Sequence, residues 1–199
     1  QKKRKNMTIN RKLLILNQIN DKKIKIRTKI KKIMVTLGGA DTYNLTKKII
    51  SQLSKLKKNI TIYIGPESKF KKNNEKNHRD IKFKYLVKNL EKQMKNYDLI
   101  ICGGGVTPFN AASLGLPSLI IANEAHEVKT AKYLERIGSS IYLGFRNFLI
   151  TKKMLTKINV KKMSKKSLKN FDNNSINNFI KLLKKKYLKF SNRKIIYEK

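Results

Sequence analysis

The stretch DLIICGGGVTPFNAASLGLPSLIIANEAHEVKTAKYLERIGSSIYLG, residues 98–144, decides the fold of this chain. Short aliphatic runs alternate in it with segments of helical period, and glycines stand where one pattern gives way to the next. Strands that alternate with helices are typical of βαβ units, in which helices cover both faces of a parallel sheet. The pattern predicts, in order, a strand over 98–102, a helix over 107–114, a strand over 118–122, a helix over 128–137 and a strand over 140–143.

The sequence before this stretch continues the same alternation. Its pattern predicts strands over 33–37, 60–64 and 81–86 and helices over 44–56 and 90–94. The strand segments are largely aliphatic, which fits strands that are buried on both sides. We therefore expect an α/β fold with one Rossmann-like, doubly wound parallel sheet of about six strands, followed by a basic helical extension.

The ends of the chain differ from this middle part. Residues 13–16 have the pattern of a strand. Residues 176–190 have that of an amphipathic helix, whose apolar face is expected to dock on a protein surface, with a membrane as the alternative. Because the first residue is Gln1, we expect the back part of a longer polypeptide. The expected parts are the end of a preceding domain with a basic linker over 1–32, the Rossmann-like domain over 33–150 and a lysine-rich helical tail over 151–199.

Composition excludes several classes of protein. The single cysteine, Cys102, rules out a disulfide framework and a cysteine-based zinc site, and its place in a buried strand predicts core packing. The two histidines, His78 and His126, lie too far apart in sequence for metal-ligand spacing, so we expect no metal and no cofactor. A membrane span needs about 20 apolar residues, and no run approaches that length. The expected location is cytoplasmic, with peripheral contact at the inner face of the membrane left open.

The net charge of +36 does not by itself indicate a protein that binds nucleic acid. Only seven of the 48 basic residues are arginines, whose planar guanidinium suits base and phosphate recognition better than an ammonium does. The charge also avoids the segment that carries the motifs, since residues 97–150 hold four basic and four acidic residues. We interpret the lysines mainly as a solvated surface, with attraction to anionic lipid or to nucleic acid as alternatives.

Two glycine-rich turns, Gly38-Gly39 and Gly103-Gly104-Gly105, follow predicted strands and lead into predicted helices. Glycines let backbone N–H groups approach a ligand closely. Thr107 suits an N-cap, Pro108 suits a first helical turn, and the positive end of a helix dipole favours an anion. We expect a phosphate or diphosphate at these turns; the alternative is that the glycines only make tight turns. A Gly104→Val substitution is expected to abolish that binding and to leave the fold intact.

A polar cluster, Asn123-Glu124-Ala125-His126-Glu127, follows the predicted strand over 118–122. Because the carboxyl ends of parallel strands meet at one edge of a sheet, the cluster is expected near the glycine turns. There His126 can donate to a phosphate or to a sugar hydroxyl. The strict motifs of P-loop NTPases, dinucleotide dehydrogenases and α/β-hydrolases are absent, so these three classes are not expected.

Taken together, these residues resemble the C-terminal, nucleotide-sugar-binding half of GT-B glycosyltransferases. The resemblance is to the MurG-like glycosyltransferase family 28 and, more closely, to the PseG/SpsG-like group of UDP-sugar hydrolases and transferases. It is carried mainly by residues 98–144, with weaker support from IMVTLGGADTYNLT (33–46), LVKNLEKQMKNYDLII (86–101) and LLILN (13–17).

The resemblance implies a two-domain enzyme that binds a nucleoside diphosphate sugar in the cleft between its domains. It places the base near Val87 and the diphosphate at the two glycine turns and Thr107. It places the sugar or phosphate against the polar cluster, at Asn123, Glu124, His126 and Glu127. At the position of the family's ribose-binding acidic residue this chain has Asn110, which can pair with a hydroxyl but lacks the charge that strengthens a carboxylate's hydrogen bond.

The resemblance therefore implies the UDP-sugar-binding half of a glycosyltransferase that acts in cell-surface glycan biosynthesis. An alternative within the same group is a hydrolase that releases UDP and free sugar. An alternative of another class is a non-catalytic basic module that binds nucleic acid or an anionic membrane. In such enzymes the catalytic base usually belongs to the N-terminal domain, so a missing domain or partner subunit is expected. His126 is the one catalytic candidate in this chain.

Overall fold

A computed structural model of the chain describes residues 24–56, 58–70, 78, 80–171 and 175–191. The strand expected over 13–16 lies outside these residues. Six strands are present in the described part of the chain, and each was expected: five from short apolar runs and β3 from its alternation of apolar residues with lysines. They are β1 (Lys32–Thr36), β2 (Asn59–Ile64), β3 (Ile81–Tyr85), β4 (Leu99–Cys102), β5 (Ser118–Ala122) and β6 (Ser140–Phe145).

The strands form one six-stranded sheet in the order β3-β2-β1-β4-β5-β6, and every pairing is parallel. Ile33 of β1 pairs with Ile60 of β2 on one side and with Leu99 of β4 on the other. The chain thus builds the sheet outward from β1 in one direction, then returns to its other side with β4. This is the order of a doubly wound Rossmann-like sheet, and the expected fold class is confirmed.

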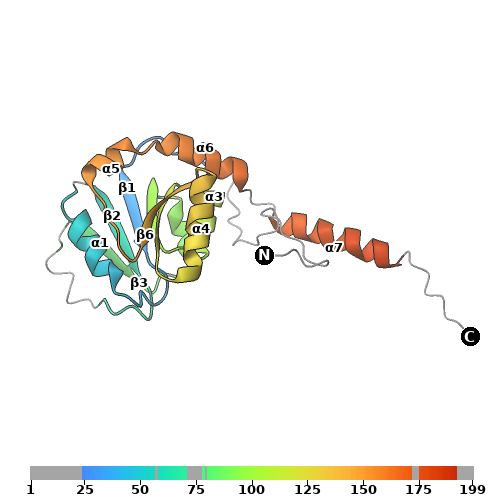
Figure 1. Cartoon of the computed structure of the whole chain (residues 1–199), viewed down its shortest axis with the longest axis horizontal. Coiled ribbons are helices and arrows are strands. Elements are labelled where there is room, and N and C mark those ends of the chain that lie inside the picture. Colours follow the sequence, from blue (N-terminus) through green and yellow to red (C-terminus); the bar gives the residue numbers. More distant parts are fainter. Residues whose placement is uncertain (1–23, 57, 71–77, 79, 172–174, 192–199) are drawn as a thin grey trace, which may run out of the picture.

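Helices cover both faces of this sheet (Figure 1). The helices of the described residues are α1 (Leu45–Leu53), α2 (Leu90–Met94), α3 (Thr107–Ser113), α4 (Ala125–Arg136), α5 (Lys152–Lys157), α6 (Val160–Asn170) and α7 (Ser175–Ser191), of which α7 does not contact the sheet. Successive residues of β1 point to opposite faces. Ile33 and Val35 join a core with residues of α1 and α5, while Met34 joins a second core with residues of α2, α3 and α4. The two cores explain why the central strands are aliphatic throughout.

A buried arginine in the segment before β1 forms hydrogen bonds with this domain. The Arg27 guanidinium donates to the carbonyl oxygens of Lys25, Tyr97 and Leu114, and its backbone N–H donates to Ser164 Oγ of α6 at 3.1 Å. Ser164 Oγ in turn donates to Gly115 O at 2.6 Å. Burial lowers the pKa of Arg27 to about 10, so the side chain remains charged at neutral pH. Residues 24–31 and α6 therefore pack on the Rossmann-like body, and the division of the chain at 32 and 150 stays a prediction.

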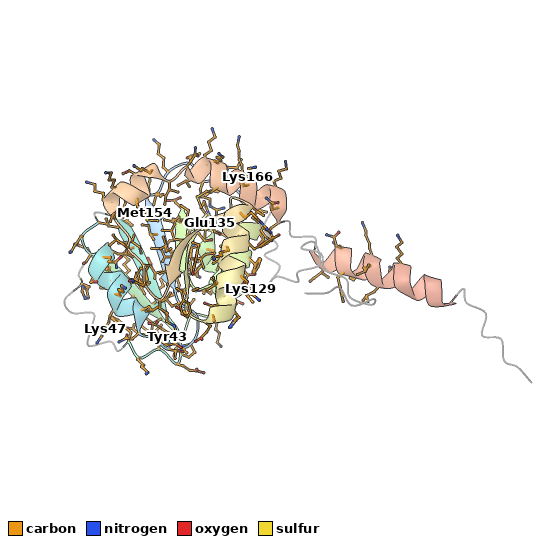
Figure 2. All side chains as sticks on the ribbon, viewed as in Figure 1. Tyr43, Lys47, Lys129, Glu135, Met154 and Lys166 are labelled. Atoms are coloured by element: carbon orange, nitrogen blue, oxygen red, sulfur yellow. The ribbon has the colours of Figure 1, made fainter. Side chains whose placement is uncertain are left out.

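The basic helix α7 extends away from the Rossmann-like domain (Figure 1), with Ile180 42% and Leu183 50% exposed. Among the described residues, no helix is both long enough and apolar enough to cross a membrane. Lysines surround the domain rather than gathering on one side, as Lys47 on α1, Lys129 on α4 and Lys166 on α6 illustrate (Figure 2).

Candidate functional site

The two glycine turns lie at the point where the strand order reverses. In the register of the sheet, Thr36 of β1 pairs with Cys102 of β4; Gly103 follows β4 directly, and one residue, Leu37, separates β1 from Gly38. The two turns therefore leave the carboxyl ends of adjacent strands whose chains continue to opposite sides of the sheet. In open α/β sheets this switch point is the usual place for a ligand.

The turn after β4 presents backbone donors that no other described group uses. Among the described residues, the N–H groups of Gly104, Gly105, Val106 and Thr107 donate to no other group. Gly105 and Val106 are exposed, Val106 by 61%. Unpaired backbone donors of this kind are satisfied by water or by a ligand's oxygens.

The expected N-cap at Thr107 is wrong by one residue. Val106 is the N-cap, because its carbonyl oxygen accepts from the backbone N–H of Phe109 at 3.0 Å and of Asn110 at 3.2 Å, which closes the first turn of α3. Thr107 is the first helical residue, and its hydroxyl caps no N–H group in the described part of the chain. Pro108 stands in the first turn as expected. With seven residues, α3 is a short helix, so the amides of the turn count for more than its dipole.

Gly104 is required for packing as well as for access. A methyl group at Gly104 would lie 2.6 Å from Glu127 Cβ and 3.0 Å from Glu127 O, which are atoms of α4. A valine at this position must therefore push α4 away from the turn. We therefore expect Gly104→Val to disturb the packing of α4 as well as any ligand binding, so its effect on binding alone stays a prediction.

The carboxylate of Glu127 lies beside the triple-glycine turn and caps α4. Its Oε2 accepts from the backbone N–H of Asn123 at 2.7 Å and of Glu124 at 3.4 Å. This capping lets α4 begin at Ala125, three residues before the expected start. Methyl groups built at Gly103 and Gly105 would lie 3.7 Å and 3.6 Å from Glu127 Oε1, so the polar cluster and this turn are brought together.

Two further members of the polar cluster differ in their surroundings. A methyl group at Gly103 would lie 3.1 Å from Asn123 Nδ2, and Asn123 Oδ1 is buried without a hydrogen-bond partner in the described structure. His126 is exposed, and no hydrogen bond of its side chain to the described residues is present. It stands on the first turn of α4, where it is open to a ligand or to solvent.

The turn after β1 is open to solvent but its helix is already capped. Gly38 has φ +85°, a conformation that favours glycine, and a methyl group on Gly38 or Gly39 would meet nothing within 4 Å. The buried carboxylate of Asp41 accepts from the backbone N–H of Leu45 at 2.8 Å and of Thr46 at 3.0 Å. The carboxylate of Asp41 therefore occupies the backbone N–H groups at the start of α1. A ligand on this side can bind only at the glycine turn itself.

The positions expected to hold the base and ribose lie together on the face covered by α2 and α3. Val87 is half-buried against the core of that face. Asn110 is buried, its Nδ2 donates to Glu91 Oε1 of α2 at 3.2 Å, and its Oδ1 has no hydrogen-bond partner among the described residues. A carboxylate thus stands directly beside the position at which the chain has an amide.

The sequence did not predict a role for Arg146, which lies in the same region. Its guanidinium carbon is 3.3 Å from the centroid of the Tyr43 ring and 4.6 Å from that of Phe145. Its Nε donates to Asn123 O at 2.7 Å, and its Nη2 lies 3.5 Å from Glu124 Oε2. Only its place directly after the last strand could have drawn attention to it.

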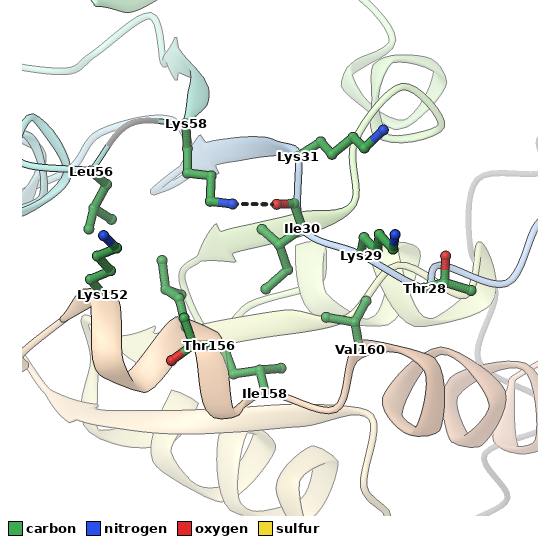
Figure 3. A pocket seen from close by; sticks show the side chains of 11 residues that line it. Thr28, Lys29, Ile30, Lys31, Leu56, Lys58, Lys152, Thr156, Ile158 and Val160 are labelled. Atoms are coloured by element: carbon green, nitrogen blue, oxygen red, sulfur yellow. Dashed lines mark hydrogen bonds between the residues drawn. The ribbon is translucent and has the colours of Figure 1, made fainter.

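A cavity of about 610 Å³ lies at the opposite end of the sheet (Figure 3). Residues just before β1 and β2 line it together with α5, among them Ile30, Lys58 and Lys152. Tyr43, near the glycine turns, and Met154 of α5 mark the two ends of the domain (Figure 2). This cavity is thus separate from the site at the switch point.

The sequence profile of the glycosyltransferase family 28 C-terminal domain matches residues 32–187 of this chain. The chain belongs to this family. It is 30% identical over 122 residues to the spore coat polysaccharide biosynthesis protein SpsG of Bacillus subtilis, a match that covers 56% of this chain and 35% of that protein. The resemblance found in the sequence is confirmed.

Solved structures of glycosyltransferases share the fold of this family 28 domain. MurG of Acinetobacter baumannii matches with a TM-score of 0.59 and 18% identity, over 79% of this chain and 50% of MurG. Spinosyn rhamnosyltransferase SpnG, solved with thymidine diphosphate, matches with a TM-score of 0.54 and 14% identity, over 78% of this chain and 46% of SpnG. The matched part amounts to only 25% to 35% of the length of the curated relatives.

Proposed function

We propose that this domain binds the nucleoside diphosphate of a nucleotide sugar, a UDP-sugar, at the switch point of its sheet. The observation that carries the proposal is the set of unused backbone donors at Gly104, Gly105, Val106 and Thr107, beside the open turn at Gly38-Gly39. Such donors suit phosphate oxygens, because the fold fixes the positions and directions of the N–H groups.

The same donors favour glycosyl transfer. When the bond between the anomeric carbon and the diphosphate oxygen breaks, its electron pair leaves on the diphosphate, and fixed N–H groups stabilise that charge. The acceptor oxygen then bonds to the anomeric carbon and gives up its proton to a base. We assign Asn110, with Glu91 beside it, to the ribose hydroxyls, and we assign Asn123 and His126 to the sugar.

The second half of the enzyme is part of the proposal. The described residues form a single sheet, and the matched relatives are much longer than the match. We assign the acceptor site and the base to a domain or subunit that faces the carboxyl ends of the strands. The relative named for spore coat polysaccharide biosynthesis supports a role in cell-surface glycan assembly.

Peripheral contact with an anionic membrane is a separate part of the proposal. The segment of α7, residues 175–191, contains five lysines and no acidic residue. Its exposed Ile180 and Leu183 present apolar surface to the outside of the domain. A basic amphipathic helix of this kind binds at the surface of anionic lipid bilayers.

Calorimetric titration with UDP at moderate salt tests the binding proposal, with dTDP and ADP as competitors of the same charge. Saturable binding of UDP supports it. Absence of heat with all three, together with tight RNA binding that weakens steeply as salt rises, would replace it with a basic nucleic-acid-binding module. Once the other half of the enzyme is supplied, product analysis separates transfer from hydrolysis, because hydrolysis releases free sugar without an acceptor.

A further inference from the structure

Arg146 joins three loops at the carboxyl ends of the strands. Its ring contact is with Tyr43, in the loop after β1, and its hydrogen bond is with Asn123 O, in the loop after β5. Asn123 in turn lies against Gly103 of the loop after β4, where a methyl group would approach its Nδ2 to 3.1 Å. The guanidinium is therefore part of the same edge of the sheet as the proposed diphosphate site.

The position of the Arg146 side chain is fixed from several directions. Its backbone has φ +58°, a left-handed conformation that costs a non-glycine residue energy and persists where the surroundings enforce it. The Arg146 N–H donates to Ala122 O at 3.0 Å, the Tyr43 ring covers one face of the guanidinium, and Nε is held by Asn123 O. Because the plane of the guanidinium and its Nε edge are fixed, the direction in which Nη1 and Nη2 point is fixed as well.

The edge formed by Nη1 and Nη2 has N–H groups that can still donate to a ligand. Nη1 makes no hydrogen bond to any described residue, and the contact of Nη2 with Glu124 Oε2 is long, at 3.5 Å, between side chains that are 35% and 44% exposed. The neighbouring polar groups include the carboxylates of Glu124 and Glu127, which repel an anionic ligand. A diphosphate at this edge needs a cation to offset them.

We infer that Arg146 is the residue that supplies this cation and binds the phosphate oxygens of the nucleotide through its free guanidinium edge. The inference rests on the proposed function and adds to it the recognition of charge, which backbone amides alone do not provide. Guanidinium–phosphate hydrogen bonds are charge-assisted and depend on the planar fork, so lysine replaces arginine only in part.

The test compares UDP with uridine, which lacks the phosphates, on the whole chain. Calorimetry follows UDP, and NMR titration follows the weaker uridine. Arg146→Ala is expected to weaken UDP binding at least tenfold and to leave uridine binding unchanged. The UDP affinity of Arg146→Lys is expected to lie between those of Arg146→Ala and the unchanged chain. Arg136→Ala is the matched control, because the Arg136 guanidinium also packs on a tyrosine, 5.7 Å from the Tyr133 ring centroid, at the far end of α4.

Three results would overturn the inference, and each is distinct. Equal UDP affinity of Arg146→Ala and the unchanged chain would mean that Arg146 does not touch the phosphates. Equal losses of UDP and uridine, with a lower melting temperature, would mean that it only holds the loops in place. Failure of the unchanged chain to bind UDP or inorganic pyrophosphate would remove the proposed function, and the inference with it.

Discussion

Gly104 and Glu127 are in such close contact that no larger residue fits at position 104: a methyl group there would lie 2.6 Å from Glu127 Cβ. The triple-glycine turn of this family 28 domain therefore has two structural roles. It exposes backbone donors at its outer side, and at its inner side it lets α4 approach the end of β4.

Gly104→Ala is expected to destabilise the domain by roughly 1–3 kcal/mol, because overpacking forces α4 to move. Gly105→Ala is the matched control: its methyl group would lie 3.6 Å from Glu127 Oε1, an ordinary contact, and the residue is exposed. Its free energy of unfolding is expected to change by less than about 0.5 kcal/mol. Urea denaturation followed by circular dichroism measures both, and equal stability of the two variants would contradict the packing role of Gly104.

Asn110→Asp tests the contact between Asn110 and Glu91. The substitution sets two carboxyl groups about 3.2 Å apart in a buried position, so one of them must take up a proton or the helices must separate. We expect a loss of roughly 1–3 kcal/mol at pH 7, and a smaller loss at pH 5, where a shared proton is available. The double variant Asn110→Asp, Glu91→Gln restores a carboxylate–amide pair with side chains of unchanged length and is expected to recover most of the stability. No recovery would show that the contact is incidental.

The Cys102 thiol is expected to be inert in the folded protein. It is fully buried, and desolvation with the nearby Glu127 charge raises its pKa far above the usual value. Labelling by Ellman's reagent at pH 8 should proceed only at the rate of unfolding. Because the folded pKa is raised, the contribution of this group to stability is complete below the pKa of the unfolded thiol, about 8.5, and is lost as the pH rises above it. The free energy of unfolding of Cys102→Ala should decrease less as the pH rises. Rapid labelling of the native protein by Ellman's reagent would contradict the buried position of the thiol.

The buried arginine before β1 is expected to be necessary for stability. Arg27→Ala leaves the carbonyl oxygens of Tyr97 and Leu114 without their donor and removes a charged hydrogen-bonding group. We expect a loss of about 2–4 kcal/mol in the free energy of unfolding. Arg136→Ala, at an exposed position, serves as the control and should change stability by less than about 0.5 kcal/mol. If both variants unfold at the same urea concentration, residues 24–31 are not an integral part of the domain.

The helix α7 is expected to direct the chain to anionic membranes. Cosedimentation with vesicles of phosphatidylcholine and phosphatidylglycerol should exceed that with phosphatidylcholine alone. Replacing the exposed Ile180 and Leu183 by asparagine should reduce it at unchanged charge, because the apolar face inserts below the headgroups. Binding that follows salt concentration but ignores these two substitutions would reduce the contact to simple charge attraction.

Local sequence predicted the sheet well because the buried strands are short apolar runs and the edge strand β3 alternates apolar residues with lysines. The start of α4 was misplaced because Glu124 and Glu127 were assigned to a ligand rather than to capping. The role of Arg146 could not be predicted, since its ring contact with Tyr43 joins residues about a hundred positions apart and exists only once β1 and β6 share a sheet. In the same way, only the folded structure shows that Gly104 faces α4 and that Asn110 has Glu91 beside it.

The central claim is that the unused amides after β4 bind the diphosphate, and NMR titration of ¹⁵N-labelled protein with UDP tests it most directly. We expect the amide signals of Gly104, Gly105, Val106 and Thr107 to shift together and to saturate with UDP. Signals of Lys29 and Lys58, at the cavity on the other end of the sheet, should stay in place. Shifts that cluster at that cavity, with the glycine signals unmoved, would contradict the claim.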